Sequence, residues 1–223
     1  MPRWEPDARA RLERAALALF LERGYDATTV VEIADRAGLT KSTFFRHFAD
    51  KREVLFGGQE ILTDLFIAGI RAAPPAASAV DCIAAALEAA ASVFSPERRD
   101  LAPARRTVIT ANSELQEREL LKRARMAAAI TEALQARGVD EPSARLAAEV
   151  GVLAFGIAYT RWAAAASHES FARIAHAALQ DLTARAAALG EHAPTDVSSA
   201  GGPDSGPDSG PESGTGVHSD FVA

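Results

Sequence analysis

The sequence lacks the residue patterns that most enzymes, metal proteins and secreted proteins need. Its 223 residues include one cysteine, Cys82, so the chain forms neither an intramolecular disulfide nor a cysteine-rich metal cage. It has no glycine-rich phosphate loop, no histidine pair four residues apart and no nucleophile elbow. The histidines are scattered, and His168 and His176 are badly placed for sharing a metal. We therefore expect no enzyme activity, no metal and no cofactor.

Long apolar runs and strand patterns are also missing. The N-terminal segment MPRWEPDARARLERAA contains no apolar stretch of the kind found in signal peptides. The apolar run near 146–166 is interrupted by Glu149 and Arg161, which disfavours a membrane span. No window alternates apolar and polar residues as a half-buried strand does, while a hydrophobic content of 48% suffices for an ordinary core. The expectation is an all-α, soluble, cytoplasmic protein with no membrane partner.

The chain has no overall positive charge either. Its formal net charge is −6, which at first argues against a nucleic-acid partner. The charge is unevenly distributed, however. Residues 1–56 carry ten Lys and Arg against nine Asp and Glu, whereas 191–223 carry six acidic residues and no basic ones. Within 40–52, four basic residues accompany Asp50 alone, giving a local charge of +3. Local charge attracts phosphates, so the acidity of the tail does not exclude DNA binding.

Residues 191–223 differ in kind from the rest of the chain. The run GPDSGPDSGPESG repeats a short unit of Gly, Pro, acid and Ser, which is too polar to offset the entropy lost on ordering. We expect a disordered acidic tail here. A solubilising role is favoured over competition with DNA for the basic segment.

Apolar residues recurring at helical spacing predict about nine helices. The expected helices cover about 6–23, 30–36, 41–48, 52–73, 78–94, a segment with an irregular start at Pro103, 114–137, 142–166 and 170–189. Gly24, Gly38 and Gly138 are expected helix terminators. Gly57-Gly58 is a possible soft point in the fourth helix, and Pro74-Pro75 ends it.

The stretch 28–51 predicts two short helices joined by a tight turn. Thr29 and Glu32 have the spacing of a capping box, and Thr40 is expected to cap the second helix. Three apolar residues should pack inward: Leu39, Phe44 and Phe48. This leaves a polar and basic surface of Lys41, Ser42, Thr43, Phe45, Arg46 and His47. A plain solvated face is the alternative, but the tight Ala37-Gly38-Leu39 bend favours a DNA-reading unit.

The run ALALFLERGYDATTVVEIADRAGLTKSTFFRHFADKREVL resembles the N-terminal signature of the TetR family of bacterial transcriptional regulators across about residues 10–56. This resemblance implies a helix-turn-helix on the first three helices, a fourth connecting helix and a helical C-terminal domain that binds a small ligand and dimerises. The expected domains are 1–52 for DNA binding, 53–190 for ligand binding and dimerisation, and 191–223 for the acidic tail. The segment SELQERELLKRARMAAAITEAL also resembles actinobacterial-type members grouped with acyl-CoA-responsive regulators.

The resemblance also implies roles for single residues. Thr28 and Thr29 match positions that contact phosphate at the start of the second helix, and His47 and Lys51 match further backbone contacts. The groove-facing positions of the recognition helix are Lys41, Ser42, Thr43 and Arg46. Phe45 departs from the family pattern, because a Tyr there would hydrogen bond to a phosphate. A Phe can still pack on a sugar or a thymine methyl group.

The C-terminal domain is expected to hold a small-molecule effector and to form a homodimer. The candidate pocket residues are bulky or adaptable apolar side chains among many alanines: Phe94, Val108, Ile109, Met126, Ile130, Phe155, Tyr159 and Trp162. Each of them can instead be plain core, and Arg161 is a further polar candidate. The last two helices should pair with their copies in a second subunit. The alternative is that these two helices only cover the core of their own subunit.

These observations predict a homodimeric repressor that binds a palindromic double-stranded DNA operator and is released by a mostly apolar small molecule. Three alternatives remain open at this point. First, a protein of the same fold can be an activator or a ligand-independent regulator. Second, the chain can be a helical interaction module whose basic face binds an acidic protein partner. Third, it can be a small-molecule enzyme, for which turnover by the purified protein would have to be measured.

Overall fold

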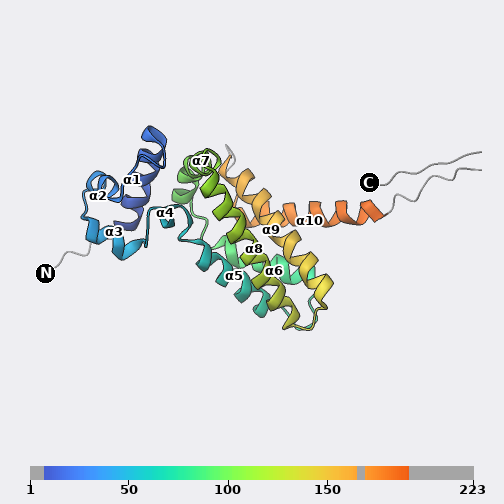
Figure 1. The fold of residues 1–223 in the computed structure, drawn as a ribbon. Coiled ribbons are helices and arrows are strands. Elements are labelled where there is room, and N and C mark those ends of the chain that lie inside the picture. The colour runs from blue at the N-terminus through green and yellow to red at the C-terminus, as the bar shows by residue number, and fades with distance from the viewer. Residues whose placement is uncertain (1–7, 165–168, 191–223) are drawn as a thin grey trace, which may run out of the picture.

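The computed structural model describes residues 8–164 and 169–190, which form ten α-helices and no strand within those ranges (Figure 1). The all-α prediction is confirmed. The three N-terminal helices form a head at one end, and the later helices form a larger body beside it. The tail predicted at 191–223 lies outside the described residues.

The head consists of α1 (Ala8–Arg23), α2 (Val30–Arg36) and α3 (Lys41–His47). Gly24 and Gly38 have φ values of 87° and 65°, the left-handed conformation expected of helix terminators. The capping box of Thr29 and Glu32 is present, and the Thr40 hydroxyl accepts a hydrogen bond from the Thr43 amide. These caps fix where each short helix begins and therefore how the two helices meet.

One sequence prediction needs correction at the junction of head and body. The single helix expected over 52–73 is two helices, α4 (Glu53–Phe56) and α5 (Gln59–Ala72), separated by Gly57-Gly58. A Cβ added at Gly57 would lie 2.7 Å from the Glu53 carbonyl oxygen, too close for any other residue at this break. The interruption raises the number of described helices above the nine expected and makes α4 a separate single turn.

The irregular helix start expected at Pro103 is also wrong. Helix α7 (Pro96–Thr110) begins at Pro96, directly after Ser95, and runs through Pro103 without a break. Proline suits the first helical position, because an amide there has no partner within the helix. Pro103 sits in the helix interior, where it removes one backbone donor.

The body is completed by α6 (Ala79–Ala91), α8 (Ser113–Gln135), α9 (Glu141–Ala163) and α10 (Phe171–Gly190). Helix α5 packs closely on α6, and a Cβ at Gly69 would lie 2.6 Å from the Ala85 carbonyl oxygen. Gly151 on α9 allows a similar approach to Ile83 of α6. The small residues of α9 therefore bring helices of the same chain together.

The buried side chains form two clusters. One fills the body, and the other fills the head. The head cluster is not confined to the first three helices, because it includes Phe56 of α4, Val108 and Ile109 of α7, and Leu115 of α8. The head is therefore attached to the body through a shared apolar core.

Within the described residues, no helix is long and apolar enough to cross a membrane.

Candidate nucleic-acid interface and ligand cavity

Helix α3 presents a polar surface to solvent. Its apolar side is held inside by Phe44 and Phe48, both buried as predicted, whose ring centroids lie 5.5 Å apart. The opposite side leaves Lys41, Ser42 and Arg46 exposed. None of the three side chains has a hydrogen bond or ion pair to another described residue, so their donors are free to meet a ligand.

Phe45 and Thr43 occupy the middle of this surface. The Phe45 ring is 49% exposed, with the Lys41 ammonium 5.9 Å from its centroid. An exposed aromatic ring offers a face for a sugar or a thymine methyl, in keeping with its predicted role. The Thr43 hydroxyl lies 2.9 Å from that of Thr40, while His47 is exposed at the end of the helix.

The two threonines before α2 differ from each other. Thr28 is 1% exposed, and its hydroxyl donates a hydrogen bond of 2.8 Å to the Gly24 carbonyl oxygen. Thr29 is exposed, but its hydroxyl already bonds to the Glu32 carboxylate as part of the capping box. Both hydroxyls are therefore occupied within the chain. The predicted phosphate contacts of these two hydroxyls would require them to leave their present partners.

Lys51 is also occupied internally. Its ammonium nitrogen lies within hydrogen-bond distance of three carbonyl oxygens, those of Tyr25 at 2.7 Å, Thr28 at 3.1 Å and Asp26 at 3.3 Å. It also lies 4.2 Å from the centroid of the Tyr25 ring. An ammonium group has three donors, so this arrangement uses them all. Lys51 thus ties the chain after α3 to the turn between α1 and α2.

A cavity of about 310 Å³ lies where head and body meet. This volume is at the lower end of the range typical for small-molecule sites. Six of the eight predicted pocket residues line it: Phe94, Ile109, Met126, Phe155, Tyr159 and Trp162. Val108 and Ile130 do not line it; Val108 lies in the head cluster and Ile130 in the body cluster. Leu17 of α1 also lines the cavity, so head residues contribute to its wall.

Sequence reasoning missed the basic side chains of the cavity. Its lining includes six of them: Arg9, Arg98, Arg105, Arg106, Lys122 and Arg123. The spacing of Arg98, Arg105 and Arg106 along one helix, and of Lys122 and Arg123 along another, was the available signal. Helical spacing alone does not show which basic side chains face a cavity.

Three comparisons connect this geometry to known proteins. Residues 13–56 match the family described as bacterial regulatory proteins, tetR family. The matched segment contains all of α2 and α3 with their caps and most of α1.

Residues 13–56 belong to the TetR family's N-terminal segment.

Similarity to named relatives is concentrated in short segments. The chain is 37% identical over 81 residues to the transcriptional regulator TcmR of Streptomyces glaucescens, covering 36% of each chain. It is 37% identical over 67 residues to the activator FasR of Mycolicibacterium smegmatis, covering 30% of this chain and 31% of FasR. It is 47% identical over 47 residues to the repressor KstR2 of Mycobacterium tuberculosis, covering 21% of this chain and 24% of KstR2. The matches span roughly a third or less of these relatives.

Over most of the chain, the fold has a counterpart among solved structures. A TetR-family transcriptional regulator from Syntrophomonas wolfei superimposes with a TM-score of 0.55 at 17% identity, covering 81% of this chain and 95% of the other. At that identity the likeness concerns the fold alone. It agrees with the predicted arrangement of a helix-turn-helix head and a helical body, and the family agrees with a regulator rather than an enzyme.

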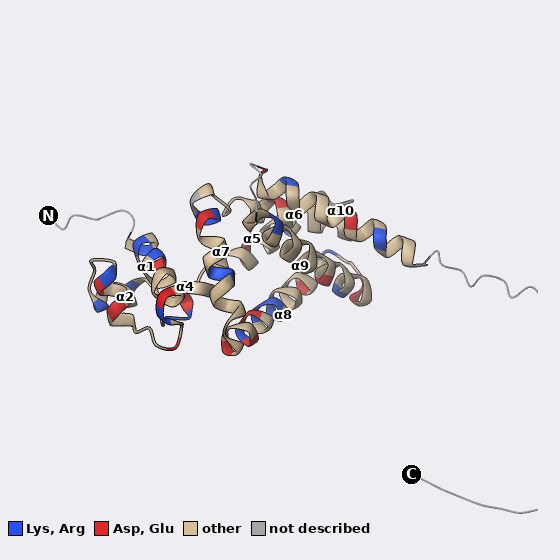
Figure 2. Cartoon of the chain, turned by 90° about the horizontal axis from the view of Figure 1, so that it is seen from above, with Lys and Arg blue, Asp and Glu red and all other residues tan. Residues whose placement is uncertain are grey.

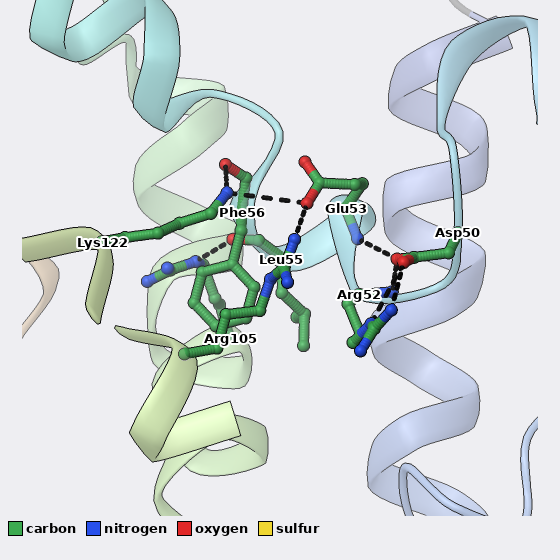
Figure 3. Close-up of polar contacts among 8 residues, drawn as sticks. Asp50, Arg52, Glu53, Leu55, Phe56, Arg105 and Lys122 are labelled. Atoms are coloured by element: carbon green, nitrogen blue, oxygen red, sulfur yellow. Dashed lines mark hydrogen bonds and ion pairs between the residues drawn. The ribbon is translucent and has the colours of Figure 1, made fainter. Parts of the chain in front are cut away.

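The short helix α4 is held between head and body by basic residues (Figure 3). The Arg105 Nε donates a hydrogen bond of 2.7 Å to the Leu55 carbonyl oxygen, and Lys122 Nζ donates one of 3.2 Å to the Phe56 carbonyl oxygen. Glu53 of α4 forms ion pairs with Arg118 and Lys122 of α8. Burial lowers the pKa of Lys122, while the charge of Glu53 opposes that shift.

The buried ring of Phe56 completes this attachment. The charged ends of Arg105, Lys122 and Arg118 lie 5.4, 5.3 and 5.9 Å from its centroid. Cations at this distance from a ring face are attracted to it. Asp50 accepts hydrogen bonds from the backbone amides of Arg52 and Glu53 and so fixes the start of α4 from the head side.

Proposed function

We propose that this chain is a DNA-binding transcriptional repressor that recognises a palindromic operator as a homodimer and responds to a small-molecule effector. The observation that carries the proposal is that Lys41, Ser42 and Arg46 are exposed and have no ion pair or side-chain hydrogen bond to a described residue, on a capped helix of seven residues. Arg and Ser can reach base edges in a major groove, and Lys can hold phosphates. Helix α2 and the buried Phe44 brace that helix.

An exposed apolar stripe on α9 supports the homodimer. Leu146 and Leu153, two helical turns apart, are 67% and 51% exposed, and the half-buried Val150 and Ile157 continue the stripe. The small buried residues of α9 already face the same chain, so the exposed Leu146 and Leu153 are left for a partner. Much of α10 extends beyond the body (Figure 1) and is mostly uncharged (Figure 2), so it can join the same contact. Two-fold pairing would present two recognition helices about 34 Å apart.

The position of the cavity supports control by an effector. Its wall includes Leu17 of the head, Phe56 of α4 and Tyr159 of the body. A ligand whose affinity depends on how these three parts are arranged would favour one arrangement of the head over another. The protein would release DNA if, in that arrangement, the distance between the two recognition helices no longer matches the spacing of the two half-sites of the operator.

Activation is the second candidate, because one similar protein, FasR, is named an activator while KstR2 is named a repressor. We favour repression, since a dimer bound across a promoter blocks transcription without further contacts. Reporter output with and without the protein separates the two.

The test of DNA binding combines footprinting with titration. We expect the protein to protect a palindromic site upstream of its own or a neighbouring gene. In fluorescence anisotropy it should bind that duplex at least about a thousandfold more tightly than a random duplex at the same salt concentration. Equal binding to the two duplexes contradicts the proposed sequence recognition.

A further inference from the structure

The cavity between head and body carries an excess of positive charge. Among the described residues that line it, six basic side chains stand against two acidic ones, Glu13 and Glu119, a formal surplus of four. Glu13 accepts a bond of 3.0 Å from Arg9, and Glu119 lies 3.8 Å from Arg105. The other four cations have no acidic partner among the described residues of the cavity lining. Lys122 finds one outside it, in Glu53.

The remaining three cations, Arg98, Arg106 and Arg123, have no ion pair or side-chain hydrogen bond to another described residue. Guanidinium groups stay protonated in proteins, so Arg cannot relieve such a surplus by losing a proton. Arg98 and Arg106 are exposed and can be hydrated, whereas Arg123 is half-buried. Arg123 is therefore the cation with most to gain from an anionic ligand.

The backbone of α9 makes room for Arg123. A Cβ added at Gly156 would lie only 2.2 Å from a terminal nitrogen of Arg123, so the guanidinium rests against the bare backbone of α9. Any other residue at 156 would push this flexible group aside. The glycine therefore keeps the charge of α8 at the wall of the cavity.

The cavity lining also contains a group of aromatic side chains. The ring centroid of Phe94 lies 5.7 Å from that of Phe155, 6.1 Å from that of Tyr159 and 5.2 Å from that of Trp162. Such a group of rings suits an apolar ligand body. The cavity thus combines aromatic side chains with cations that form no ion pair with the described residues.

We propose that the effector is an amphiphile with an acidic head group, a carboxylate or a phosphate, which Arg123 binds while the apolar body lies among Phe94, Phe155 and Trp162. The inference rests on the proposed function only in calling the ligand an effector. The sequence predicted a mostly apolar ligand, and the inference adds that this ligand carries a negative charge. A planar guanidinium matches either acid, because it can donate two parallel hydrogen bonds.

Probes with the same ten-carbon chain test the head group directly by isothermal titration calorimetry. Decanoate and decyl phosphate should each be compared with 1-decanol and decyltrimethylammonium. We expect at least one anion to bind about tenfold or more tightly than the alcohol, and the cation to bind no better than the alcohol. The stronger of the two anions identifies the head group as carboxylate or phosphate.

Variants then locate the binding group. Arg123→Gln should weaken the preferred anion about tenfold while leaving decanol affinity unchanged. Arg125→Gln is the matched control, because Arg125 is an exposed residue of the same helix that does not line the cavity. Gly156→Ala should weaken the anion in the same way by displacing the guanidinium, and circular dichroism should show both cavity variants folded.

Three results overturn the proposal: equal affinity for decanoate, decyl phosphate and decanol, tighter binding of the cationic probe, or no binding of any probe. An equal loss of anion affinity in Arg125→Gln and Arg123→Gln also contradicts the assigned position. Operator binding is measured without probe, so its failure would count against the proposed function alone. An anion that binds the cavity but leaves operator affinity unchanged would show a ligand site without an effector role and so overturn the inference.

Discussion

The ammonium group of Lys122 on α8 donates a hydrogen bond of 3.2 Å to the carbonyl oxygen of Phe56, the last residue of α4. The same nitrogen lies 3.6 Å from a carboxylate oxygen of Glu53, the first residue of that helix. One side chain of the body therefore contacts both ends of the single turn that leads to the head. Lys122 also lines the cavity, so the residue that holds α4 is one that a ligand in the cavity could contact.

Lys122→Met should lower the free energy of unfolding by about 1–3 kcal/mol, because the buried Phe56 carbonyl and Glu53 both lose a partner. A double-mutant cycle with Glu53→Gln should give a coupling of about 0.5–3 kcal/mol, measured by urea denaturation. Arg125→Met on the exposed side of α8 serves as the control and should change stability little. Additive effects of the two substitutions would show that the pair does not stabilise α4.

Lys51→Ala tests whether that residue acts through the fold or on DNA directly. We expect stability to fall by about 1–3 kcal/mol, since three carbonyl groups lose their donor. Binding should weaken alike for all duplexes, because the turn before α2 loses its brace. The salt dependence of binding should stay unchanged, since the donors of Lys51 are already used.

Lys41→Ala is the matched comparison, because Lys41 is exposed and should leave stability unchanged. A salt slope that falls by about 1 in Lys51→Ala, with no loss of stability, would instead show a direct phosphate contact.

Arg46→Ala should reduce discrimination between the operator and a duplex changed at one base pair by about 1–3 kcal/mol. The physical reason is that an exposed guanidinium without an internal partner is free to donate to a base edge. Anisotropy titrations at fixed salt measure this effect, with Arg125→Ala as a control far from α3. If Arg46→Ala discriminates between the two duplexes as well as the wild type does, Arg46 does not contribute to recognition of the base sequence.

Much of the head was predictable from the sequence, because its signals are local. A threonine three residues before an acid predicts the capping box of Thr29 and Glu32. A glycine after a helical run predicts the helix ends at Gly24 and Gly38. Both features depend on hydrogen bonds within a few residues. The inward placement of Phe44 follows from helical spacing in the same way.

The occupied state of Lys51 and the charge of the cavity depend on contacts across long stretches of sequence. Lys51 meets carbonyl groups more than twenty residues away, and the cavity gathers side chains from helices distant in the chain. Helical periodicity gives each helix its own buried side and cannot show which neighbours its basic residues meet. The helix break at Gly57-Gly58 is intermediate, since its glycines were visible but its effect depended on packing.

The outward stripe of α9 leads to a prediction about assembly. Leu146→Glu combined with Leu153→Glu should convert a dimer to a monomer in analytical ultracentrifugation, because both side chains are exposed in the single chain. A charge within an apolar interface is strongly unfavourable, whereas the monomer exposes it to water at little cost. Operator binding should weaken at the same time, since each monomer would contact one half-site only.

Leu120→Glu provides the control, because Leu120 is 64% exposed on α8, outside the stripe. It should keep both the dimer and the operator affinity. The double variant should retain the helical circular dichroism of the wild type, since neither leucine belongs to the buried core. A folded double variant that still sediments as a dimer would show that the subunits meet elsewhere, and the exposed leucines of α9 would then need another partner.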